Sequence, residues 1–289
     1  MSRLALGTAQ FGLNYGIANW HGQISHDEIK MILEHARLHG IDTLDTAISY
    51  GDSEQRLGEI GIQAWHVISK LPTVSEVSRD ISQLVADIFS KSLERLKVKR
   101  LEGLLFHQPQ QLLGEGGNRL YRAAQQLKRN GLVRKIGVSV YEPAELDFLC
   151  SRYQFDIVQV PFNIMDCRFM ELGWWSRLRE QGIELHVRSV FLQGLLLMPA
   201  HDRPEKFNRW APLWLNFENW LKLSELTPLQ ACLRYVLSFP EIKKVIIGID
   251  SLSQLKAILR AATGPIPQVP KELQLRNIDL LNPTCWTAL

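Results

Sequence analysis

The sequence predicts an α/β fold in which residues 1–289 form a single (β/α)₈ TIM barrel. Short apolar runs of β-type composition alternate with amphipathic helical patterns, which is typical of a parallel sheet built from βαβ units. Eight such units can be counted, and eight is the number that closes this barrel. A chain of 289 residues with 46% hydrophobic residues is sufficient for one domain with a large core.

Eight apolar runs are the candidate strands. They lie at residues 4–8, 41–45, 67–71, 101–107, 134–140, 156–160, 183–188 and 244–248. Each run is short enough for a strand, and the intervals between the runs are long enough for a helix that returns the chain to the next parallel strand.

Two of the expected helices carry recognisable boundary signals. Ser25 can cap the first helix, Glu28 completes a capping box, and Gly40 ends the helix. Ser251 and Gln254 repeat the capping-box pattern before the last helix of the barrel. The apolar stripe of the first helix, which we expect to face the barrel, consists of Ile29, Ile32, Leu33 and Ala36.

A long aromatic-rich segment, residues 189–226, follows the seventh predicted strand. Because the loops after the strands of such barrels build the active site, we expect this segment to be a lid or cofactor clamp. The alternative is a set of extra helices packed against the side of the barrel. A C-terminal tail begins at residue 264. The aromatic residues of the segment are Phe191, Phe207, Trp210, Trp214, Phe217 and Trp220.

Charge and composition favour a small-molecule partner. The 33 basic and 30 acidic residues are spread along the chain and give a net charge of +3, so no basic block suggests nucleic acid or a membrane surface. A signal peptide and a membrane-spanning run are not recognisable, so we expect a cytoplasmic protein. The oligomeric state stays open. The four cysteines, which lack the spacing of a zinc site or a disulfide framework, are Cys150, Cys167, Cys232 and Cys285.

Four ionisable residues lie where barrel strands are predicted to end. Asp45 ends the second strand, Lys70 lies near the end of the third, and His107 ends the fourth. Tyr50 follows Asp45 by five residues. Because the carboxyl ends of all eight strands meet at one rim, these side chains are expected to converge. Each residue alone has an ordinary structural explanation, but the set in this order favours a catalytic site.

The chemistry expected of these four residues is proton transfer to a carbonyl oxygen. Tyr50 is a weak acid, and a nearby Lys70 ammonium would lower its pKa by roughly 1 to 3 units. Asp45 would keep Lys70 charged. His107 would form a hydrogen bond with the substrate oxygen and assist proton delivery. Such a site suits the reduction of a carbonyl group.

Several motifs resemble the aldo-keto reductase family, and the resemblance covers nearly the full length of the chain. The string G-I-D-T-L-D-T-A-I-S-Y-G-D-S-E-Q-R-L-G, from Gly40 to Gly58, is similar to the family signature around its catalytic aspartate and tyrosine. Leu6–Gly12, Leu104–His107 and Lys135–Ser139 resemble its first, fourth and fifth strands. The resemblance implies a catalytic tetrad of Asp45, Tyr50, Lys70 and His107.

The same resemblance implies an oxidoreductase that transfers a hydride between NAD(P)H and a carbonyl carbon, without a metal. His35 and His39 have a spacing that can bind metal, but we expect them on a solvated helix face. Ser139 and Gln159 match positions that bind the nicotinamide carboxamide, and Gly248 and Ser251 are candidates for anion binding at a helix N-terminus. The full set of implied cofactor-binding residues is Gly7, Thr8, Ala9, Asp45, Ser139, Gln159, Arg188, Ser189, Gly248, Asp250 and Ser251.

Two departures from the family pattern lie near the expected nicotinamide. Val140 stands where the family usually has Asn, so one amide contact to the carboxamide is lost. Arg188 stands where an aromatic residue often stacks on the nicotinamide, and its planar guanidinium can stack in its place.

Two further departures lie near the expected adenosine. Asp250 occupies the region where members selective for NADP carry a basic residue, and Ile258 replaces a common Asn. A carboxylate repels a 2′-phosphate and accepts hydrogen bonds from a free ribose, which favours NADH over NADPH. Lys256 and Arg260 on the following helix could still reach a phosphate.

Three functions remain open from the sequence. The first is an NAD(P)H-dependent reductase of an aldehyde or ketone, sugar-like substrates included, or a dehydrogenase running in reverse. The second is a cofactor-binding regulatory or scaffold barrel, which the altered Val140, Asp250 and Ile258 motivate. The third uses the nicotinamide transiently in an elimination or epimerisation. Substrate identity depends on loops, in which Tyr15 and Trp20 are the expected pocket residues.

Overall fold

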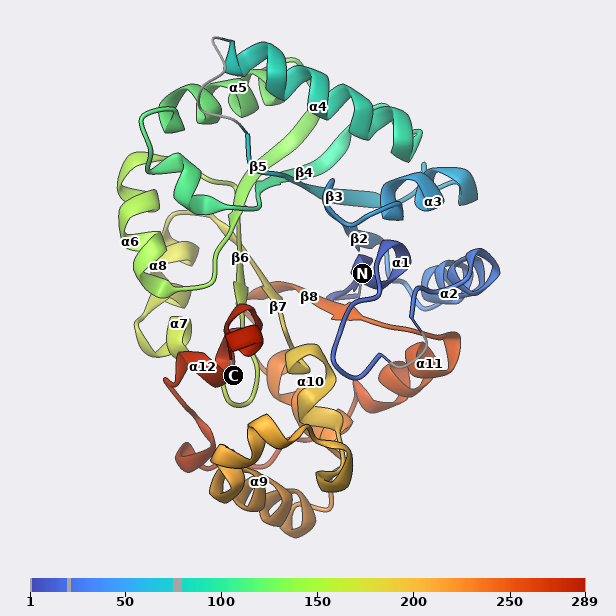
Figure 1. Ribbon diagram of the computed structural model, residues 1–289, viewed down its shortest axis with the longest axis vertical. Helices are drawn as coiled ribbons and strands as arrows, with labels where there is room; N and C mark the ends of the chain where they lie inside the picture. The colour runs from blue at the N-terminus through green and yellow to red at the C-terminus, as the bar shows by residue number, and fades with distance from the viewer. Residues whose placement is uncertain (1, 20–21, 75–79, 289) are drawn as a thin grey trace.

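The computed structural model describes residues 2–19, 22–74 and 80–288 and has a closed barrel at its centre (Figure 1). Each strand pairs in parallel with the next one, and β8 pairs with β1. All eight predicted strands are present within a few residues of their expected bounds, which confirms the (β/α)₈ barrel. The strands are β1 (Leu4–Gly7), β2 (Thr43–Asp45), β3 (His66–Leu71), β4 (Leu101–Phe106), β5 (Val133–Ser139), β6 (Ile157–Pro161), β7 (Glu184–Arg188) and β8 (Ile242–Gly248).

Helices surround the barrel and connect its strands (Figure 1). The α-helices are α1 (Ala9–Gly12), α2 (His26–Leu38), α3 (Ser53–Ile60), α4 (Ile81–Leu96), α5 (Gly117–Arg129), α6 (Pro143–Arg152), α7 (Arg168–Glu171), α8 (Trp174–Glu180), α9 (Ala211–Leu223), α10 (Pro228–Leu237), α11 (Leu252–Ala261) and α12 (Ile278–Leu281). Shorter 3₁₀ turns are η1 (Pro109–Leu112), η2 (Leu192–Leu197), η3 (Ala200–Asp202), η4 (Glu205–Trp210), η5 (Lys271–Leu273) and η6 (Pro283–Ala288).

Helix α2 forms as its sequence pattern predicts. The Ser25 hydroxyl accepts a hydrogen bond from the Glu28 backbone N–H at 3.2 Å. After the helix, Gly40 adopts a φ of +74°, the left-handed region that glycine tolerates best. The predicted stripe is buried at all of its positions, Ile29, Ile32, Leu33 and Ala36.

The two predicted capping boxes are incomplete. The Glu28 carboxylate does not return to its own helix start, because it accepts the Leu252 N–H at 2.6 Å at the start of α11. The Gln254 side chain accepts the N–H of Asp250 at 2.8 Å, one residue before the expected Ser251. In both helices the predicted N-cap hydroxyl accepts its hydrogen bond. The side chain three residues later accepts a hydrogen bond from an N–H group other than that of its own N-cap residue.

A buried carboxylate fixes α3 behind the loop that carries Tyr50. Glu54 is 2% exposed and accepts hydrogen bonds from Ser69 on β3 at 2.8 Å and from Ser92 on α4 at 2.7 Å. Arg95 donates two more, at 2.9 and 2.6 Å. Four donors thus replace the water that a carboxylate would lose on burial, so α3, β3 and α4 are held together by one side chain.

The C-terminal tail packs back onto the fold. Arg276 forms an ion pair with Glu171 of α7 at 2.9 Å. Lys206 donates to the Trp286 carbonyl at 2.7 Å, and the rings of Phe207 and Trp286 meet edge to face with centroids 5.0 Å apart. The tail therefore ties α7 to the segment that follows β7.

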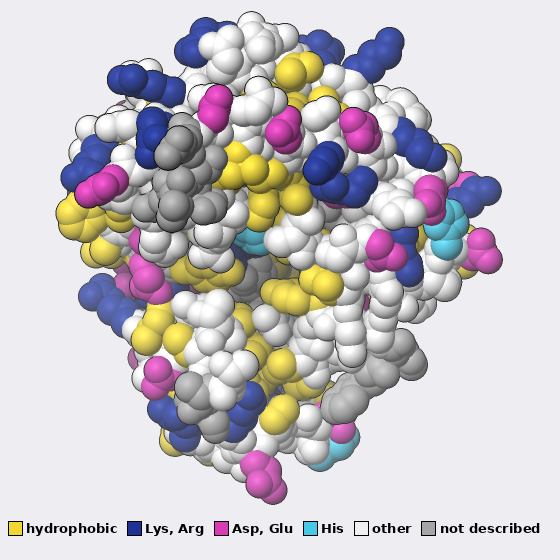
Figure 2. All heavy atoms as spheres, turned by 45° about the horizontal axis from the view of Figure 1, so that its top comes forward, with side chains coloured by type: hydrophobic (Ala, Val, Ile, Leu, Met, Phe, Trp, Pro, Cys, Tyr) yellow, Lys and Arg dark blue, Asp and Glu magenta, His cyan; other side chains and the backbone are white. Residues whose placement is uncertain are grey.

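The surface mixes charges of both signs. Figure 2 shows acidic and basic side chains interspersed, with hydrophobic side chains gathered around a hollow near the middle of the visible face. All four cysteines are free thiols. Across the described ranges, the helices are too short or too polar for a membrane span.

We expect Glu54→Ala to lower the free energy of unfolding by about 3 kcal/mol, because it leaves Ser69, Ser92 and Arg95 without their shared acceptor. Urea denaturation measures this loss. The control is Asp147→Ala, which removes a solvent-exposed pair with Arg177 and should cost less than about 0.5 kcal/mol. Equal losses in the two variants would contradict the structural role of Glu54.

Candidate active site

The structure brings the four predicted catalytic residues together at the carboxyl ends of β2, β3 and β4. The Lys70 ammonium lies 2.5 Å from Asp45 Oδ1 and 5.2 Å from the centroid of the Tyr50 ring. The Tyr50 and His107 rings meet edge to face, with centroids 5.8 Å apart. The four side chains therefore lie close together, with Asp45 and Lys70 on strands, Tyr50 on a loop and His107 just after β4.

Asp45 is the centre of the polar contacts inside the barrel. It is 4% exposed and Lys70 is 1% exposed. Oδ1 of Asp45 accepts from Lys70, and Oδ2 accepts from the Gln159 amide at 2.7 Å. Lys70 also donates to the Thr46 carbonyl at 2.9 Å. Both buried charges are therefore paired, as buried charges must be if the fold is to be stable.

Tyr50 has the opposite pKa shift from the one we expected. Burial raises the pKa of Tyr50, and the Asp45 carboxylate raises it further, while Arg188 acts in the other direction. The prediction that Lys70 lowers this pKa was wrong. The Asp45 carboxylate lies 2.5 Å from the Lys70 ammonium and neutralises its charge. Tyr50 is thus a neutral phenol at physiological pH and can donate a proton.

His107 is also neutral at physiological pH. Burial lowers its pKa to about 4, and the positive charges of Lys70 and Arg188 act in the same direction. Its Nδ1 atom lies 3.2 Å from the Ser49 hydroxyl. A neutral imidazole has one N–H and one lone pair, so His107 can hold a substrate oxygen without adding a positive charge.

The loop that carries Tyr50 is held by a close backbone approach. A Cβ atom on Gly12 would lie 1.9 Å from the Tyr50 carbonyl, and one on Gly51 would lie 2.2 Å from the Gly12 carbonyl. Gly51 also has a φ of +53°. Only glycine fits at these two positions, and their contact sets the height of Tyr50 above the barrel.

A cavity of about 420 Å³ opens at this rim. Tyr50, Lys70 and His107 line it on one side of the barrel, and Gly248 and Asp250 line it after β8. Such a volume is within the usual range of small-molecule sites. The predicted site residues that line the cavity are Gly7, Thr8, Ala9, Tyr15, Asp45, Tyr50, Lys70, His107, Ser139, Arg188, Ser189, Gly248 and Asp250.

Two of the predicted site residues that the structure describes do not line the cavity. Gln159 is fully buried, with its amide between Asp45 and the Ser139 hydroxyl, which donates to it at 3.1 Å. Ser251 caps α11, where its hydroxyl accepts the Gln254 N–H at 3.2 Å. Trp20 lies outside the described residues. Gln159 therefore acts through Asp45 and Ser139 in this structure.

The sequence analysis missed several residues of the cavity wall. Tyr141 comes two residues after the end of β5, so the position of this strand end could have identified it. Phe191 belongs to the aromatic segment predicted as a lid or cofactor clamp, and Gln10 lies inside the Leu6–Gly12 motif, but neither was named as a site residue. Asp202 carries no comparable signal. The missed residues include Gln10, Tyr141, Phe191, Met198 and Asp202.

Arg188 occupies the position of the expected stacking aromatic and stacks on Tyr141. Its guanidinium carbon lies 4.2 Å from the centroid of that ring. It donates to the Val140 carbonyl at 2.9 Å and to the Ser139 hydroxyl at 3.3 Å. Val140 itself is fully buried in the core. The polar groups that line the cavity at this strand end are therefore those of Ser139, Tyr141 and Arg188.

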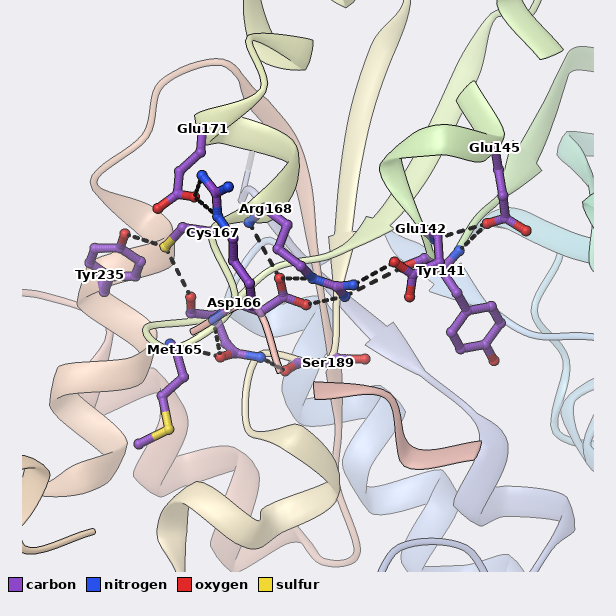
Figure 3. A network of polar contacts seen from close by, with 12 residues as sticks. Tyr141, Glu142, Glu145, Met165, Asp166, Cys167, Arg168, Glu171, Ser189 and Tyr235 are labelled. Atoms are coloured by element: carbon purple, nitrogen blue, oxygen red, sulfur yellow. Dashed lines mark hydrogen bonds and ion pairs between the residues drawn. The ribbon is translucent and has the colours of Figure 1, made fainter. Parts of the chain in front are cut away.

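A second network holds the loops beyond the rim (Figure 3). Arg168 is buried and donates to Asp166 at 2.8 and 2.9 Å and to Glu142 at 2.7 Å. The Asn163 amide donates to the Ser189 carbonyl at 3.1 Å. These bonds connect the loops after β5, β6 and β7, and so fix the backbone around the arginine and tyrosine pair described above.

Only the first part of the 189–226 segment lies at the cavity. Gln193 donates to the Tyr15 hydroxyl at 3.2 Å, and a Cβ on Gly194 would lie 2.4 Å from the Ala18 Cβ. The segment after β7 thus meets the loop after β1 beside the cavity. Helix α9 packs elsewhere: Trp220 is buried and donates to the Gln268 carbonyl at 3.2 Å.

Comparison with known proteins agrees with the fold. A model of the Aldo/keto reductase family matches residues 3–270. The chain belongs to this family. An uncharacterized oxidoreductase of Bacillus subtilis (strain 168), YqkF, is 24% identical over 253 residues, which cover 81% of each chain. The family and this relative support a carbonyl reductase role.

Solved structures with the same fold include proteins named as aldo-keto reductases. AKR11C1 from Bacillus halodurans, in its holo form, has a TM-score of 0.74 at 20% identity and covers 94% of this chain and 91% of its own. The putative aldo-keto reductase PA4992 from Pseudomonas aeruginosa has a TM-score of 0.66 at 22% identity and covers 90% of this chain and 89% of its own. At these identities the likeness shows the fold alone.

We expect Asp45→Asn and Lys70→Met each to lower the free energy of unfolding by about 3 to 5 kcal/mol, because each variant leaves one buried charge without its partner. The double variant should lose clearly less than the sum of the two single losses. Chemical denaturation of the four proteins in this cycle measures the coupling. Strict additivity would mean that the ion pair contributes no coupling.

Proposed function

We propose that this protein is an NAD(P)H-dependent oxidoreductase that reduces an aldehyde or ketone to an alcohol, or runs the reverse reaction. The observation that carries the proposal is a neutral, partly buried Tyr50 beside a charge-balanced Lys70–Asp45 pair and a neutral His107, all at the wall of one cavity. This is the protonation state that a general acid for carbonyl reduction requires.

The residues of the cavity fit a nicotinamide dinucleotide. Ser139 and Arg188 present polar groups to the cavity that Tyr50 lines, and Gly248 and Asp250 line the same cavity. Gly7 leaves space at the cavity wall. A Cβ atom at this position would lie 3.1 Å from Cγ2 of Ile246, which also lines the cavity. When bound, the nicotinamide supplies or accepts the hydride of the reaction. Ser189 and the neighbouring η2 turn would clamp the dinucleotide.

The catalytic work of the chain is to orient the carbonyl and move one proton. Tyr50 donates its phenolic proton to the carbonyl oxygen, a step that is typically worth about 10² to 10⁴ in rate. The neutral His107 donates one hydrogen bond to the same oxygen. Lys70 and Asp45 keep the base of the site polar and rigid, which favours the transition state by preorganisation.

We propose a preference for NADH. Asp250 lines the cavity together with Ile258, and the resemblance places both near the adenosine. The Asp250 carboxylate would repel a 2′-phosphate and accept hydrogen bonds from free ribose hydroxyls. Lys256 and Arg260 are not part of the cavity wall. The substrate side includes Tyr15 and Tyr141, and sugar-like aldehydes and ketones are the first compounds to screen.

We expect Tyr50→Phe to lower kcat/KM for carbonyl reduction by about 10² to 10⁴, because the proton donor is lost. The affinity for NADH should change by less than about twofold, since the phenyl ring keeps its packing. Steady-state kinetics and calorimetry measure the two quantities. The matched control is Tyr121→Phe, which removes a hydroxyl that bonds Gln154 and Gln125, residues that do not line the cavity. A normal rate in Tyr50→Phe would rule out this role.

The pH dependence of the reduction tests the two pKa shifts. Since burial lowers the pKa of His107 to about 4, the neutral imidazole is lost only as pH falls through that value. Since the pKa of Tyr50 is raised, its proton stays in place on the alkaline side. We expect kcat/KM to stay flat from about pH 5 to about pH 9. A decline that begins below pH 9 would indicate a phenol whose pKa is lowered.

We expect NADH to bind more tightly than NADPH in calorimetric titration, and Asp250→Arg to shift the balance toward NADPH by about tenfold or more. Tighter NADPH binding by the natural chain would contradict the NADH preference alone. Failure to bind either cofactor would overturn the redox proposal and favour a scaffold. A cofactor that stays bound through turnover without net oxidation would favour elimination or epimerisation.

A further inference from the structure

The guanidinium of Arg188 is a cation at the wall of the proposed active-site cavity. Arg188 lines this cavity and is half-buried. Within the described parts of the chain its hydrogen-bond acceptors are all neutral: the Ser139 hydroxyl at 3.3 Å, the Val140 carbonyl at 2.9 Å and the Ser189 hydroxyl at 3.2 Å. A partly dehydrated charge gains most from an opposite charge, so this wall favours an anionic ligand.

The catalytic end of the cavity carries this positive charge in excess. Lys70 and Asp45 form an ion pair, so their charges cancel. Burial is the largest influence on the pKa of Tyr50 and of His107, and it leaves both groups neutral. The charge of Arg188 acts to lower both of these pKa values. A charge that acts on both groups lies near the place where the substrate carbonyl must bind.

The excess at this end is a single charge. Asp202 and Asp250 line the same cavity, but neither is among the charges that act on the pKa of Tyr50 or His107. A carboxylate, with one negative charge, would balance the guanidinium. A phosphate monoester carries about 1.5 to 2 negative charges at pH 7 and would leave an excess of negative charge. The charge at this end therefore suits a carboxylate.

Two N–H groups of Arg188 are left for such a ligand. Nε has a single N–H, and each terminal nitrogen of a guanidinium has two. The hydrogen bonds to Ser139, Ser189 and Val140 use one N–H from each of the three nitrogens. One N–H on each terminal nitrogen therefore has no acceptor among the described residues. Two such groups on one planar guanidinium match the two oxygens of a carboxylate.

The orientation of the guanidinium is fixed before a ligand binds. It stacks on Tyr141, with its central carbon 4.2 Å from the centroid of the ring. The Tyr141 N–H donates to Glu145 at 2.7 Å, and the Tyr141 carbonyl accepts from Arg168 at 3.4 Å. Figure 3 shows Tyr141 held at its backbone by this network. A cation fixed in this way loses little conformational entropy when it binds an anion.

We propose that Arg188 binds a carboxylate of the substrate, so that the substrate is an oxo acid, an aldehyde or ketone that also carries a carboxylate. This inference rests on the proposed reductase function and adds its substrate class. The carboxylate is held and not altered. The carbonyl carbon accepts the hydride, the carbonyl oxygen accepts the Tyr50 proton, and the product is a hydroxy acid. Sugar acids with an open-chain aldehyde belong to the same class.

Two probes with the same carbon skeleton test the proposal: 4-oxobutanoate and its neutral methyl ester. We expect kcat/KM with NADH to be about tenfold or more higher for the acid, mainly through a lower KM. Arg188→Met removes the charge at similar length and should lower the acid-to-ester ratio of kcat/KM by about tenfold or more. Arg188→Lys keeps the charge without the planar fork and should retain part of the preference.

The ratio isolates the carboxylate, because an effect on the cofactor or on the fold changes both probes alike. The matched control is Arg177→Met. Arg177 also stacks on an aromatic ring, that of Trp174, but it does not line the cavity, so the ratio should stay unchanged. Calorimetric titration with butanoate, which has no carbonyl group to reduce, measures binding without turnover. Its affinity should fall by about tenfold in Arg188→Met.

An unchanged acid-to-ester ratio in Arg188→Met would overturn the inference. An equal loss for both probes together with weaker NADH binding would also overturn it and assign Arg188 to the cofactor. If Arg188→Met fails to fold, equal kcat/KM for acid and ester in the natural chain decides against the inference. Absence of turnover for both probes with either cofactor would refute the proposed function and this inference with it, a result distinct from equal reduction of both.

Discussion

The structure depends most on the Asp45 carboxylate inside the barrel. Burying a carboxylate costs several kcal/mol unless it is paired and hydrogen-bonded, and Asp45 has a partner at each oxygen. Through these partners a single chain of polar contacts crosses five strands. It runs through Lys70, Asp45, Gln159, Ser139 and Arg188. Movement of any one of these strands would leave a buried polar group unsatisfied, so the network and the barrel stabilise each other.

This pairing also decides the acid–base character of the site. An isolated ammonium beside Tyr50 would favour the phenolate, but an ammonium neutralised by a carboxylate exerts little net field, and burial then dominates. The result is a phenol that retains its proton. Sequence analysis could identify the members of this site but could not determine which of their opposing effects on Tyr50 is larger.

The fold and the catalytic set were predictable because both follow from strong local rules. Apolar alternation located all eight strands, and the strand-end rule selected Asp45, Lys70 and His107. The hydrogen-bond partners of individual side chains were harder to predict. Gln159 turns inward to Asp45, and Glu28 reaches a different helix, because each satisfies a group that is distant in sequence. Asp202 enters the cavity through an irregular turn that no periodic pattern describes.

The turn after β7 holds three residues with side chains in the left-handed region of backbone conformation. Ser189, Leu192 and Gln193 all have φ values between 48° and 62°, a region that costs a residue with a side chain about 1 kcal/mol relative to glycine. The bond from Asn163 to Ser189 helps to hold the first of them. Replacement by glycine would recover stability but loosen the wall of the cavity. This turn therefore gives up some stability for a fixed cavity wall.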